Sequence, residues 1–204
     1  WKPSSQTPLC GIAVQNICNE VLKMNNVPNI FSLIIGSGAT VGEKMINDRH
    51  IPLISFTGST KVGRLLMEQS GRRLLRLSLE LGGNAPFIVC SDADITKSVH
   101  GLMGSKFRNC GQTCIASNRI LIHNSRKDDF IRALLPEIEA LNVGDGFERN
   151  TTLGPMINEA AVRKVRRLVV DAIEKGASIL LGSVPSGNTL FVEPIVIIGV
   201  ESHM

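Results

Sequence analysis

The sequence lacks the apolar segments that place a chain in a membrane or direct it across one. None of its hydrophobic runs reaches the roughly 18 residues that a transmembrane helix needs. Its first residues, Trp1, Lys2 and Pro3, do not show the basic start and apolar stretch of a signal peptide. We therefore expect no membrane partner for this chain.

The sequence also lacks any segregation of charge. Its 22 lysines and arginines and its 18 aspartates and glutamates are interspersed, and the net charge is +4. Proteins that bind the phosphate backbone of a nucleic acid usually gather their basic residues in one patch or stripe. Nucleic acid is therefore not an expected partner.

Patterns typical of metal ligands and disulfides are missing as well. The five cysteines are odd in number and form no Cys-X-X-Cys pair, and the four histidines stand alone. These spacings argue against a disulfide framework and against a zinc site, so no metal is expected. Free cysteines fit a reducing compartment, for which the cytoplasm is the first expectation and the mitochondrial matrix the alternative.

The sequence does contain enough apolar residues for a core, 43% of 204, and an alternation of strand and helix patterns. In the first half, short apolar runs stop at Gly-rich turns, and helical patterns follow. This order predicts an α/β fold with a parallel sheet that holds ligands at the carboxyl ends of its strands. The expected helices cover about 8–24, 40–47 and 60–69, and the expected strands cover 31–35, 51–56 and 74–79.

Gly82 and Gly83 interrupt the pattern, and we expect a domain boundary there. Beyond it, Asp92 and Asp94 offer carboxylates at the start of a helix that runs toward residue 107. Further helices are expected over 127–141 and 158–175, and strands over 85–90, 119–123, 178–181 and 190–192. Residues 1–3 resemble the end of a strand, and a last strand over 195–200 has no partner after it. We therefore expect a chain that is incomplete at both ends.

Cys114 is the first residue that suggests covalent chemistry. A cysteine attacks a carbonyl carbon as a thiolate, which needs a lowered pKa or a nearby base, and the resulting oxyanion needs N–H donors. Cys114 lies in a Gly-Gln-Thr-Cys segment after an expected helix, where a turn would expose it. A buried, inert thiol is the open alternative.

Cys110 comes four residues earlier and would share a helical face with Cys114 if the helix continued, which would allow a disulfide between them on oxidation. Coincidental packing is the favoured alternative for Cys110. Three further cysteines fall in helix or strand patterns and are expected in the core: Cys10, Cys18 and Cys90.

Two charged residues accompany Cys114. Glu80 stands before the Gly pair and is either a general base or a buried partner for a cation. Arg108 is either a bidentate ligand for a substrate carboxylate or an ordinary surface arginine. The Gly-rich turns at 36–38 and 56–63 each follow an expected strand and precede a helix, which suits phosphate binding, although an ordinary α/β connection fits as well.

Taken together, residues 56–59 (Phe-Thr-Gly-Ser), 79–83 (Leu-Glu-Leu-Gly-Gly) and 111–114 (Gly-Gln-Thr-Cys) resemble the aldehyde dehydrogenase superfamily in order and spacing. The resemblance covers nearly the whole chain. Residues 77–89 and 105–109 are most similar to succinate semialdehyde dehydrogenases. The resemblance implies that Cys114 forms a thiohemiacetal with a small aldehyde and that Glu80 activates water to hydrolyse the thioester. It also implies that Arg108 holds the distal carboxylate of the substrate.

The resemblance further implies a nicotinamide cofactor. Because Ser5 stands where many NAD-preferring members carry a glutamate, NADP is expected, with NAD as the alternative. The implied cofactor-binding residues are Lys2, Ser5, Gly38, Thr57, Gly58, Ser59, Gly63 and Leu81.

By the same resemblance, residues 1–82 form the C-terminal part of a Rossmann-like NAD(P)-binding domain, and residues 83–204 form the N-terminal part of the catalytic domain. The family's asparagine oxyanion donor and second cofactor glutamate lie outside this sequence, so the chain alone is expected to be inactive. The full-length protein is expected to be a homodimer or homotetramer. The alternatives are a dehydrogenase for another semialdehyde or for a broad range of aldehydes, and a non-catalytic nucleotide-binding scaffold. Ala116 replaces a second cysteine that some members use in a redox disulfide.

Overall fold

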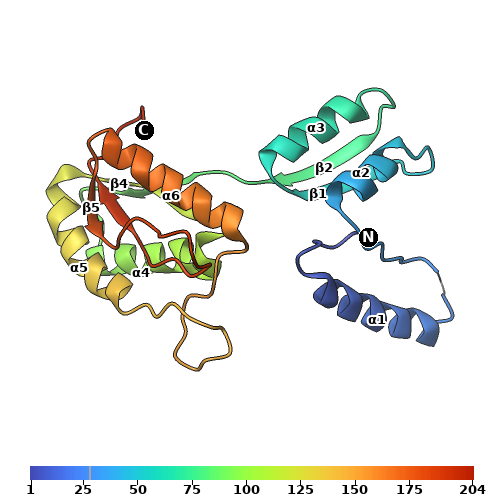
Figure 1. The fold of residues 1–204 in the computed structure, drawn as a ribbon, viewed down its shortest axis with the longest axis horizontal. Helices are drawn as coiled ribbons and strands as arrows, with labels where there is room; N and C mark the ends of the chain where they lie inside the picture. The colour runs from blue at the N-terminus through green and yellow to red at the C-terminus, as the bar shows by residue number, and fades with distance from the viewer. Residues whose placement is uncertain (28) are drawn as a thin grey trace. The chain divides into compact units, whose positions relative to one another are not determined.

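The computed structural model describes residues 1–27 and 29–204 of the chain. These residues divide into two compact units, Trp1–Leu81 and Gly82–Met204, drawn as ribbons in Figure 1. Both units combine helices with short β-sheets, and the chain has the expected α/β fold. No helix among the described residues is both long enough and apolar enough to cross a membrane.

The first unit contains the three helices and two of the three strands that the sequence predicts, in the expected order. Its helices are α1 (Pro8–Met24), α2 (Gly38–Asn47) and α3 (Thr60–Ser70), and its strands are β1 (Leu53–Gly58) and β2 (Arg76–Leu81). Pro8 is tolerated in the first turn of α1 because the N–H groups there have no helical partner. The side chains of Ser37 and Ser59 accept hydrogen bonds from the N–H groups of Thr40 (3.0 Å) and Val62 (3.3 Å), and these caps begin α2 and α3.

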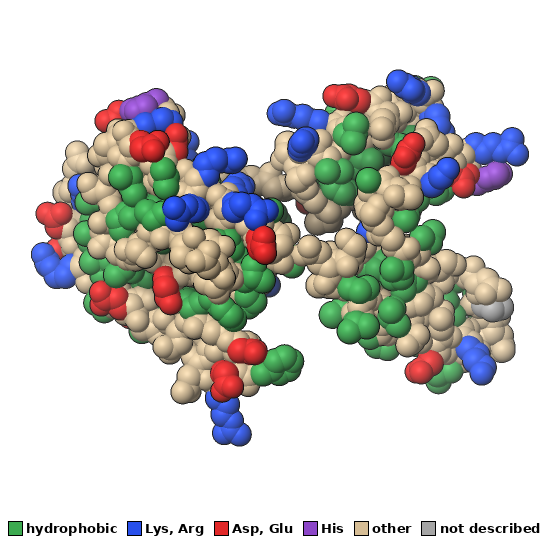
Figure 2. Space-filling model, viewed as in Figure 1, with side chains coloured by type: hydrophobic (Ala, Val, Ile, Leu, Met, Phe, Trp, Pro, Cys, Tyr) green, Lys and Arg blue, Asp and Glu red, His purple; other side chains and the backbone are tan. Residues whose placement is uncertain are grey.

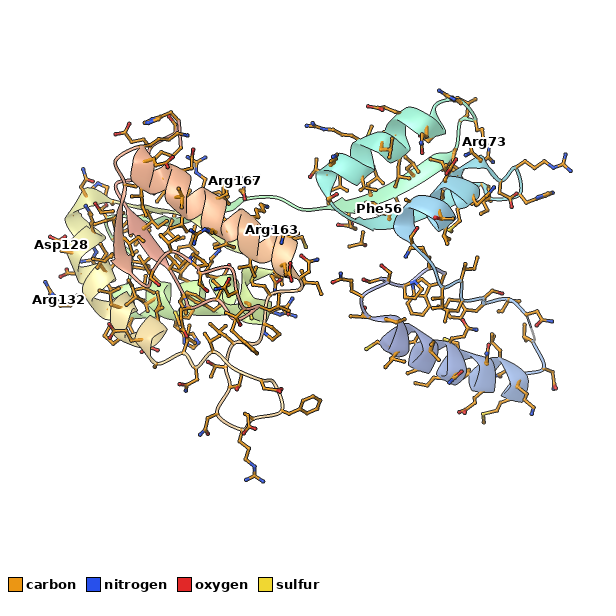
Figure 3. All side chains as sticks on the ribbon, in the orientation of Figure 1. Phe56, Arg73, Asp128, Arg132, Arg163 and Arg167 are labelled. Carbon is orange, nitrogen blue, oxygen red and sulfur yellow. The ribbon has the colours of Figure 1, made fainter. Side chains whose placement is uncertain are left out.

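Strands β1 and β2 are parallel and are connected through α3. Helices α2 and α3 pack on this pair, and the shared core consists of Ile46, Ile54, Leu66 and Leu75. Arg73, labelled in Figure 3, ties the loops of this unit together. Its guanidinium donates to the carbonyl of Ile46 at 2.5 Å and to that of Ile51 at 3.3 Å. These bonds anchor the ends of α2 and β1 to the turn before β2.

The strand predicted over residues 31–35 is wrong, because this segment belongs to no β-ladder in the structure. The N-terminal ammonium of Trp1 donates to the carbonyl of Ser32 at 2.7 Å, and the Ile34 N–H donates to the carbonyl of Trp1 at 2.9 Å. Both bonds join the 31–35 segment to Trp1 alone. A ladder needs successive pairs of residues, which this contact does not supply.

The cysteines predicted to lie in the core do not lie there. Cys10 and Cys90 are exposed, and Cys18 is half-buried. Helix α1 contributes only Gly11 to the buried residues, so it offers no covered face to the thiols of Cys10 and Cys18. Cys90 follows the last residue of its strand.

The second unit begins with a parallel pair, β3 (Ala85–Val89) and β4 (Ser117–Ile122), which are connected through α4 (Ile95–Lys106). Asp94 caps α4 by accepting a hydrogen bond from the Lys97 N–H at 3.1 Å. Helix α5 (Lys127–Glu139) packs beside α4 on this pair. Their common core consists of Val89, Val99, Leu102, Phe130, Leu134 and Ile138. Phe130 is fully buried, and burial of such a side chain stabilises the fold by about 1.5–3 kcal/mol.

The remaining elements of the second unit are α6 (Glu159–Glu174), β5 (Ser178–Leu181) and β6 (Val196–Ile198). The strand predicted over 190–192 is wrong, because β5 pairs antiparallel with β6 instead. The carbonyl of Leu190 accepts a hydrogen bond from the Met156 N–H at 2.8 Å, and this bond engages the segment in a loop contact. Pro194, which has no N–H, separates that loop from β6. The last predicted strand therefore has a partner, but one that precedes it in the sequence.

Helix α6 buries one face and exposes a basic one. Val162, Val169 and Ala172 are buried, whereas basic side chains gather over α6 in the view of Figure 2. Arg163, labelled with Arg167 in Figure 3, pairs with Glu159 one turn earlier at 3.0 Å. The basic face is thus a solvated surface with local partners.

Candidate active site

In the first unit, the predicted catalytic and cofactor residues meet at the carboxyl ends of β1 and β2. The parallel register pairs Thr57 with Glu80 and Gly58 with Leu81. Ser59 follows at once as the N-cap of α3. The carboxylate of Glu80 is exposed, which disfavours the alternative of a buried partner for a cation. The parallel register therefore brings the backbone of Glu80 next to that of Thr57, just before α3 begins.

Gly63 brings helix α3 close to the end of β2. A β-carbon built on Gly63 would lie 2.7 Å from Cδ2 of Leu81, so any larger residue at this position would require the Leu81 side chain to shift. The N-terminus of α3 directly follows the Thr57-Gly58-Ser59 turn. Such a turn can donate hydrogen bonds to a phosphate group.

A second turn brings Lys2 to the start of α2. The ammonium group of Lys2 donates to the carbonyl of Gly36 at 3.3 Å and to that of Pro3 at 2.6 Å. Gly38 begins α2, and no heavy atom lies within 4 Å of a β-carbon built there. Ser5 is exposed. The cation, the open glycine and the helix N-terminus together form a surface suited to an anionic ligand.

In the second unit, Arg108 and Cys114 lie in one connection between α4 and β4. Arg108 opens a short 3₁₀ turn (Arg108–Gly111), and both Arg108 and Cys114 are exposed. The alternative of a buried, inert thiol at Cys114 is therefore not what the structure shows. Helix α4 ends at Lys106, so Cys110 and Cys114 do not share a helical face as the sequence suggested.

Three consecutive left-handed residues shape this connection. Asn109, Cys110 and Gly111 have φ angles of 51°, 56° and 71°. Asparagine and glycine visit this region readily, whereas cysteine does so rarely. Sequence reasoning missed this turn, because Cys110 gives no signal for positive φ.

Sequence reasoning also missed the residues that hold the turn in place. The Gln112 side chain accepts a hydrogen bond from the Ile157 N–H at 2.9 Å, and the Cys110 thiol donates to the carbonyl of Gly154 at 3.2 Å. The partners lie more than 40 positions away in the sequence, so no local pattern reveals them. The only available signal was the presence of Gln112 in the same short segment as Cys114.

Lys106 is a further unpredicted feature of this connection. Burial lowers the pKa of its ammonium group, which donates to Oδ1 of Asn118 at 2.7 Å. Asn118 in turn donates to Asn84 at 2.9 Å. A β-carbon at Gly111 would lie 3.5 Å from Nζ of Lys106. The lysine thus joins the end of α4 and the start of β4 beneath the left-handed turn.

The described residues contain no candidate metal site. Within residues 1–27 and 29–204, no group of three or more His, Cys, Asp or Glu side chains is arranged to hold a metal ion. The candidate groups for chemistry remain the exposed thiol of Cys114, the exposed carboxylate of Glu80 and the guanidinium of Arg108.

Comparison with known proteins gives consistent matches over the whole sequence. The aldehyde dehydrogenase family matches residues 1–204. Succinate-semialdehyde dehydrogenase [NADP(+)] GabD of Escherichia coli (strain K12) is 40% identical over 205 residues, which cover 99% of this chain and 42% of that protein. Glutarate-semialdehyde dehydrogenase of Pseudomonas putida is 41% identical, with 98% of this chain and 41% of that protein covered.

Solved structures agree. The crystal structure of succinate-semialdehyde dehydrogenase from Burkholderia pseudomallei has a TM-score of 0.92 and 42% identity, and the match covers 100% of this chain and 42% of that one. The chain therefore spans about two-fifths of the length of the curated relatives that it matches.

Proposed function

The chain belongs to the aldehyde dehydrogenase family, and from that premise we propose that it is part of an enzyme that oxidises a small aldehyde to a carboxylic acid with NADP. The observation that carries this proposal is the exposed thiol of Cys114, on a turn held by its own hydrogen bonds, in a chain that matches the family from end to end. Glu80 and Arg108 accompany it in the order that the family resemblance implies.

Cys114 is the nucleophile. Its sulfur forms a bond to the aldehyde carbon, and the carbonyl oxygen becomes an oxyanion that N–H donors stabilise. When bound, the nicotinamide cofactor supplies the acceptor for the hydride that leaves this carbon. The product of that oxidation is a thioester on Cys114.

Glu80 is the base of the second half-reaction. It removes a proton from a water molecule, whose oxygen attacks the thioester carbon. The carbon–sulfur bond then breaks, the acid leaves, and Cys114 is restored as a thiolate. An exposed carboxylate at the end of a strand is accessible to such a water.

Arg108 selects substrates that carry a second carboxylate. Its guanidinium offers paired N–H donors that match a carboxylate in a bidentate arrangement. Succinate semialdehyde is the proposed substrate, because relatives named for it match 99–100% of this chain. Glutarate semialdehyde is the alternative, because a relative named for it is equally similar.

The residues of the first unit fit a dinucleotide. The turns before α2 and α3 present helix N-termini, Gly38 has open space around it, and the Lys2 ammonium lies at the first of these turns. The helix N-termini and the Lys2 ammonium group suit the phosphate groups of NADP. The residues that would border these phosphates are Gly38, Thr57, Gly58, Ser59, Gly63 and Leu81. Ser5 carries no charge to repel a 2′-phosphate, and the relative from E. coli is named for NADP(+), so NADP is proposed over NAD.

The two halves of the chain take different parts in this proposal. We assign residues 1–82 to the cofactor-binding domain and residues 83–204 to the catalytic domain, a division one residue beyond the boundary of the two compact units. The complete enzyme is a homo-oligomer that acts on a small aldehyde in the cytoplasm or the mitochondrial matrix.

The experiment that tests the function uses a full-length polypeptide that contains this chain. It should oxidise succinate semialdehyde with NADP, and Cys114→Ser should abolish turnover. Mass spectrometry after rapid quenching should find an acyl group on Cys114. Undiminished turnover of the Cys114→Ser protein would contradict the proposal. Cofactor binding without acylation would favour a nucleotide-binding scaffold. Kinetics on a panel of aldehydes with each cofactor would decide both specificities.

A further inference from the structure

The loop that carries Cys114 is tethered to a distant segment by the side chain of Gln112. We propose that Gln112 is a positioning residue, which sets the orientation of the Cys114 thiol by clamping its loop to the backbone of residues 155–157. The inference rests on the proposed role of Cys114 as the nucleophile. It concerns a residue that does not itself touch the reacting atoms.

Gln112 uses both ends of its amide in this clamp. Its Oε1 accepts a hydrogen bond from the Ile157 N–H at 2.9 Å. Its Nε2 donates to the carbonyl of Pro155 at 3.5 Å and to that of Asn109 at 3.4 Å. Only an amide side chain supplies an acceptor and a donor together at this length, since a carboxylate lacks the donor. The residue type is therefore matched to the backbone groups that it meets.

The segment on the far side of the clamp is itself fixed. Leu153, just before it, is 4% exposed and forms a β-bridge with Val143. The carbonyl of Leu153 accepts from the Gly144 N–H at 2.9 Å, and the Met156 N–H donates to the carbonyl of Leu190 at 2.8 Å. Gln112 thus ties the Cys114 loop to an anchored part of the unit.

Cys114 lies between this clamp and a second fixed point. On its C-terminal side, Ala116 and Ser117 are 1% and 4% exposed and lead into β4. Cys114 itself is exposed. The connection therefore holds the thiol on a short span whose later end is buried in the fold. Its earlier end depends on Gln112.

The clamp also holds the left-handed turn that precedes it. The Gln112 N–H donates to the carbonyl of Asn109 at 3.0 Å, and the Asn109 side chain donates to the carbonyl of Gln112 at 3.2 Å. The Cys110 thiol adds a weaker tether to the carbonyl of Gly154. Without the Gln112 side chain, a turn that contains a cysteine at φ 56° loses its strongest link to the rest of the unit.

A loss of position at the nucleophile lowers the rate of the chemical step more than it lowers substrate binding. Displacement of a reacting group by about 1 Å costs about 100-fold in rate. We expect Gln112→Ala to lower kcat about 10- to 100-fold and to change KM about twofold at most. The variant should also alter the rate at which iodoacetamide alkylates Cys114, and the pH profile of that reaction.

Three variants of the full-length polypeptide test this inference. Gln112→Met keeps the volume of the side chain but removes its three hydrogen bonds, so it should match Gln112→Ala. Gln15→Ala is the matched control, because the Gln15 side chain also donates to a backbone carbonyl, that of Phe31 at 3.0 Å, in the first unit. It should leave kcat and Cys114 alkylation unchanged. Wild-type kcat in a folded Gln112→Met protein would overturn the clamp as a positioning device.

A measurement on the unaltered protein keeps the inference testable if the variants do not fold. The Ile157 amide, bonded to Gln112, should be protected from hydrogen exchange in the native state. Exchange of this amide at the rate of an unstructured peptide would overturn the inference. Loss of turnover in Cys114→Ser but not in the Gln112 variants would reject the clamp alone, whereas full turnover in Cys114→Ser would reject the proposed function.

Discussion

Leu81 covers Gly63 so closely that a β-carbon on the glycine would lie 2.7 Å from Cδ2 and 2.9 Å from Cδ1 of the leucine. Leu81 is the last residue of β2 and directly follows Glu80. The close contact between Gly63 of α3 and Leu81 of β2 therefore sets the position of Glu80, the proposed general base, within its unit.

Gly63→Ala tests the importance of this contact. Overpacking of this kind usually costs about 1–3 kcal/mol in unfolding free energy, and we expect a loss in this range by urea denaturation. Gly42→Ala in α2 is the control, because no heavy atom lies within 4 Å of a β-carbon there. The control should gain about 0.5–1 kcal/mol from helix propensity. Equal stability of the two variants would mean that Leu81 moves aside without cost.

Lys106 should make stability depend on pH in the alkaline range. Because burial lowers the pKa of Lys106 in the folded chain, the unfolded chain binds more protons between that lowered pKa and the ordinary lysine pKa. The free energy of unfolding therefore rises with pH across this window, because the folded state no longer buries a charged Lys106. This increase ends above the ordinary lysine pKa. Below the lowered pKa, both states are protonated and the slope from this group disappears.

Urea unfolding at several alkaline pH values measures this slope, and Lys106→Met should reduce it. Lys97→Met, at an exposed position of the same helix, should leave it unchanged. The absence of tyrosine simplifies the measurement, since no phenol titrates in this range. A parent-like slope in Lys106→Met would contradict the assignment.

The strained backbone at Cys110 predicts an unusual order of stability. Glycine adopts a φ of 56° without the penalty of about 1 kcal/mol that a β-carbon incurs. Both Cys110→Gly and Cys110→Ala lose the thiol bond to Gly154, so their comparison isolates the backbone effect. We expect Cys110→Gly to unfold with the higher free energy by about 1 kcal/mol. At Cys90, which has no positive φ, glycine should not be favoured over alanine.

Arg108→Ala should separate substrates by their charge. A hydrogen-bonded charged group contributes about 1.5–3 kcal/mol, so the KM for succinate semialdehyde should rise about 10- to 100-fold. The KM for an uncharged aldehyde of similar length should change little. Arg132→Ala, an exposed arginine paired with Asp129 on α5, is the control. Equal effects of Arg108→Ala on both substrates would remove Arg108 from substrate recognition.

The sequence predicted the features that depend on local chemistry. Pro8 and the apolar period predicted α1, Asp94 predicted the start of α4, and Gly-rich turns after apolar runs predicted parallel pairing in β1 and β2. These signals are local, because caps and turns act within a few residues.

The sequence did not predict features that depend on distant partners. The apolar run at 31–35 has the composition of a strand, but its backbone bonds Trp1 and the Gln15 side chain rather than a neighbouring strand. Residues 190–192 also look like a strand, yet the carbonyl of Leu190 bonds Met156. In the site, Cys114 and Arg108 stood out by residue type, whereas the role of Gln112 depends on its bond to Ile157. Tertiary context decides such cases over intrinsic preference.

The parallel pairing of β3 with β4 has a consequence for the order of events during folding. The Cys114 loop immediately precedes β4, and Ser117 pairs with Ala85 only after the chain has closed a loop that contains all of α4. Loop closure of this length carries an entropic cost before any strand pair forms. During synthesis, Cys114 emerges after β3 and α4 but before β4, into which its loop leads. We therefore expect Cys114 to gain its position only when β4 docks on β3, and slow pairing of these strands would delay that step.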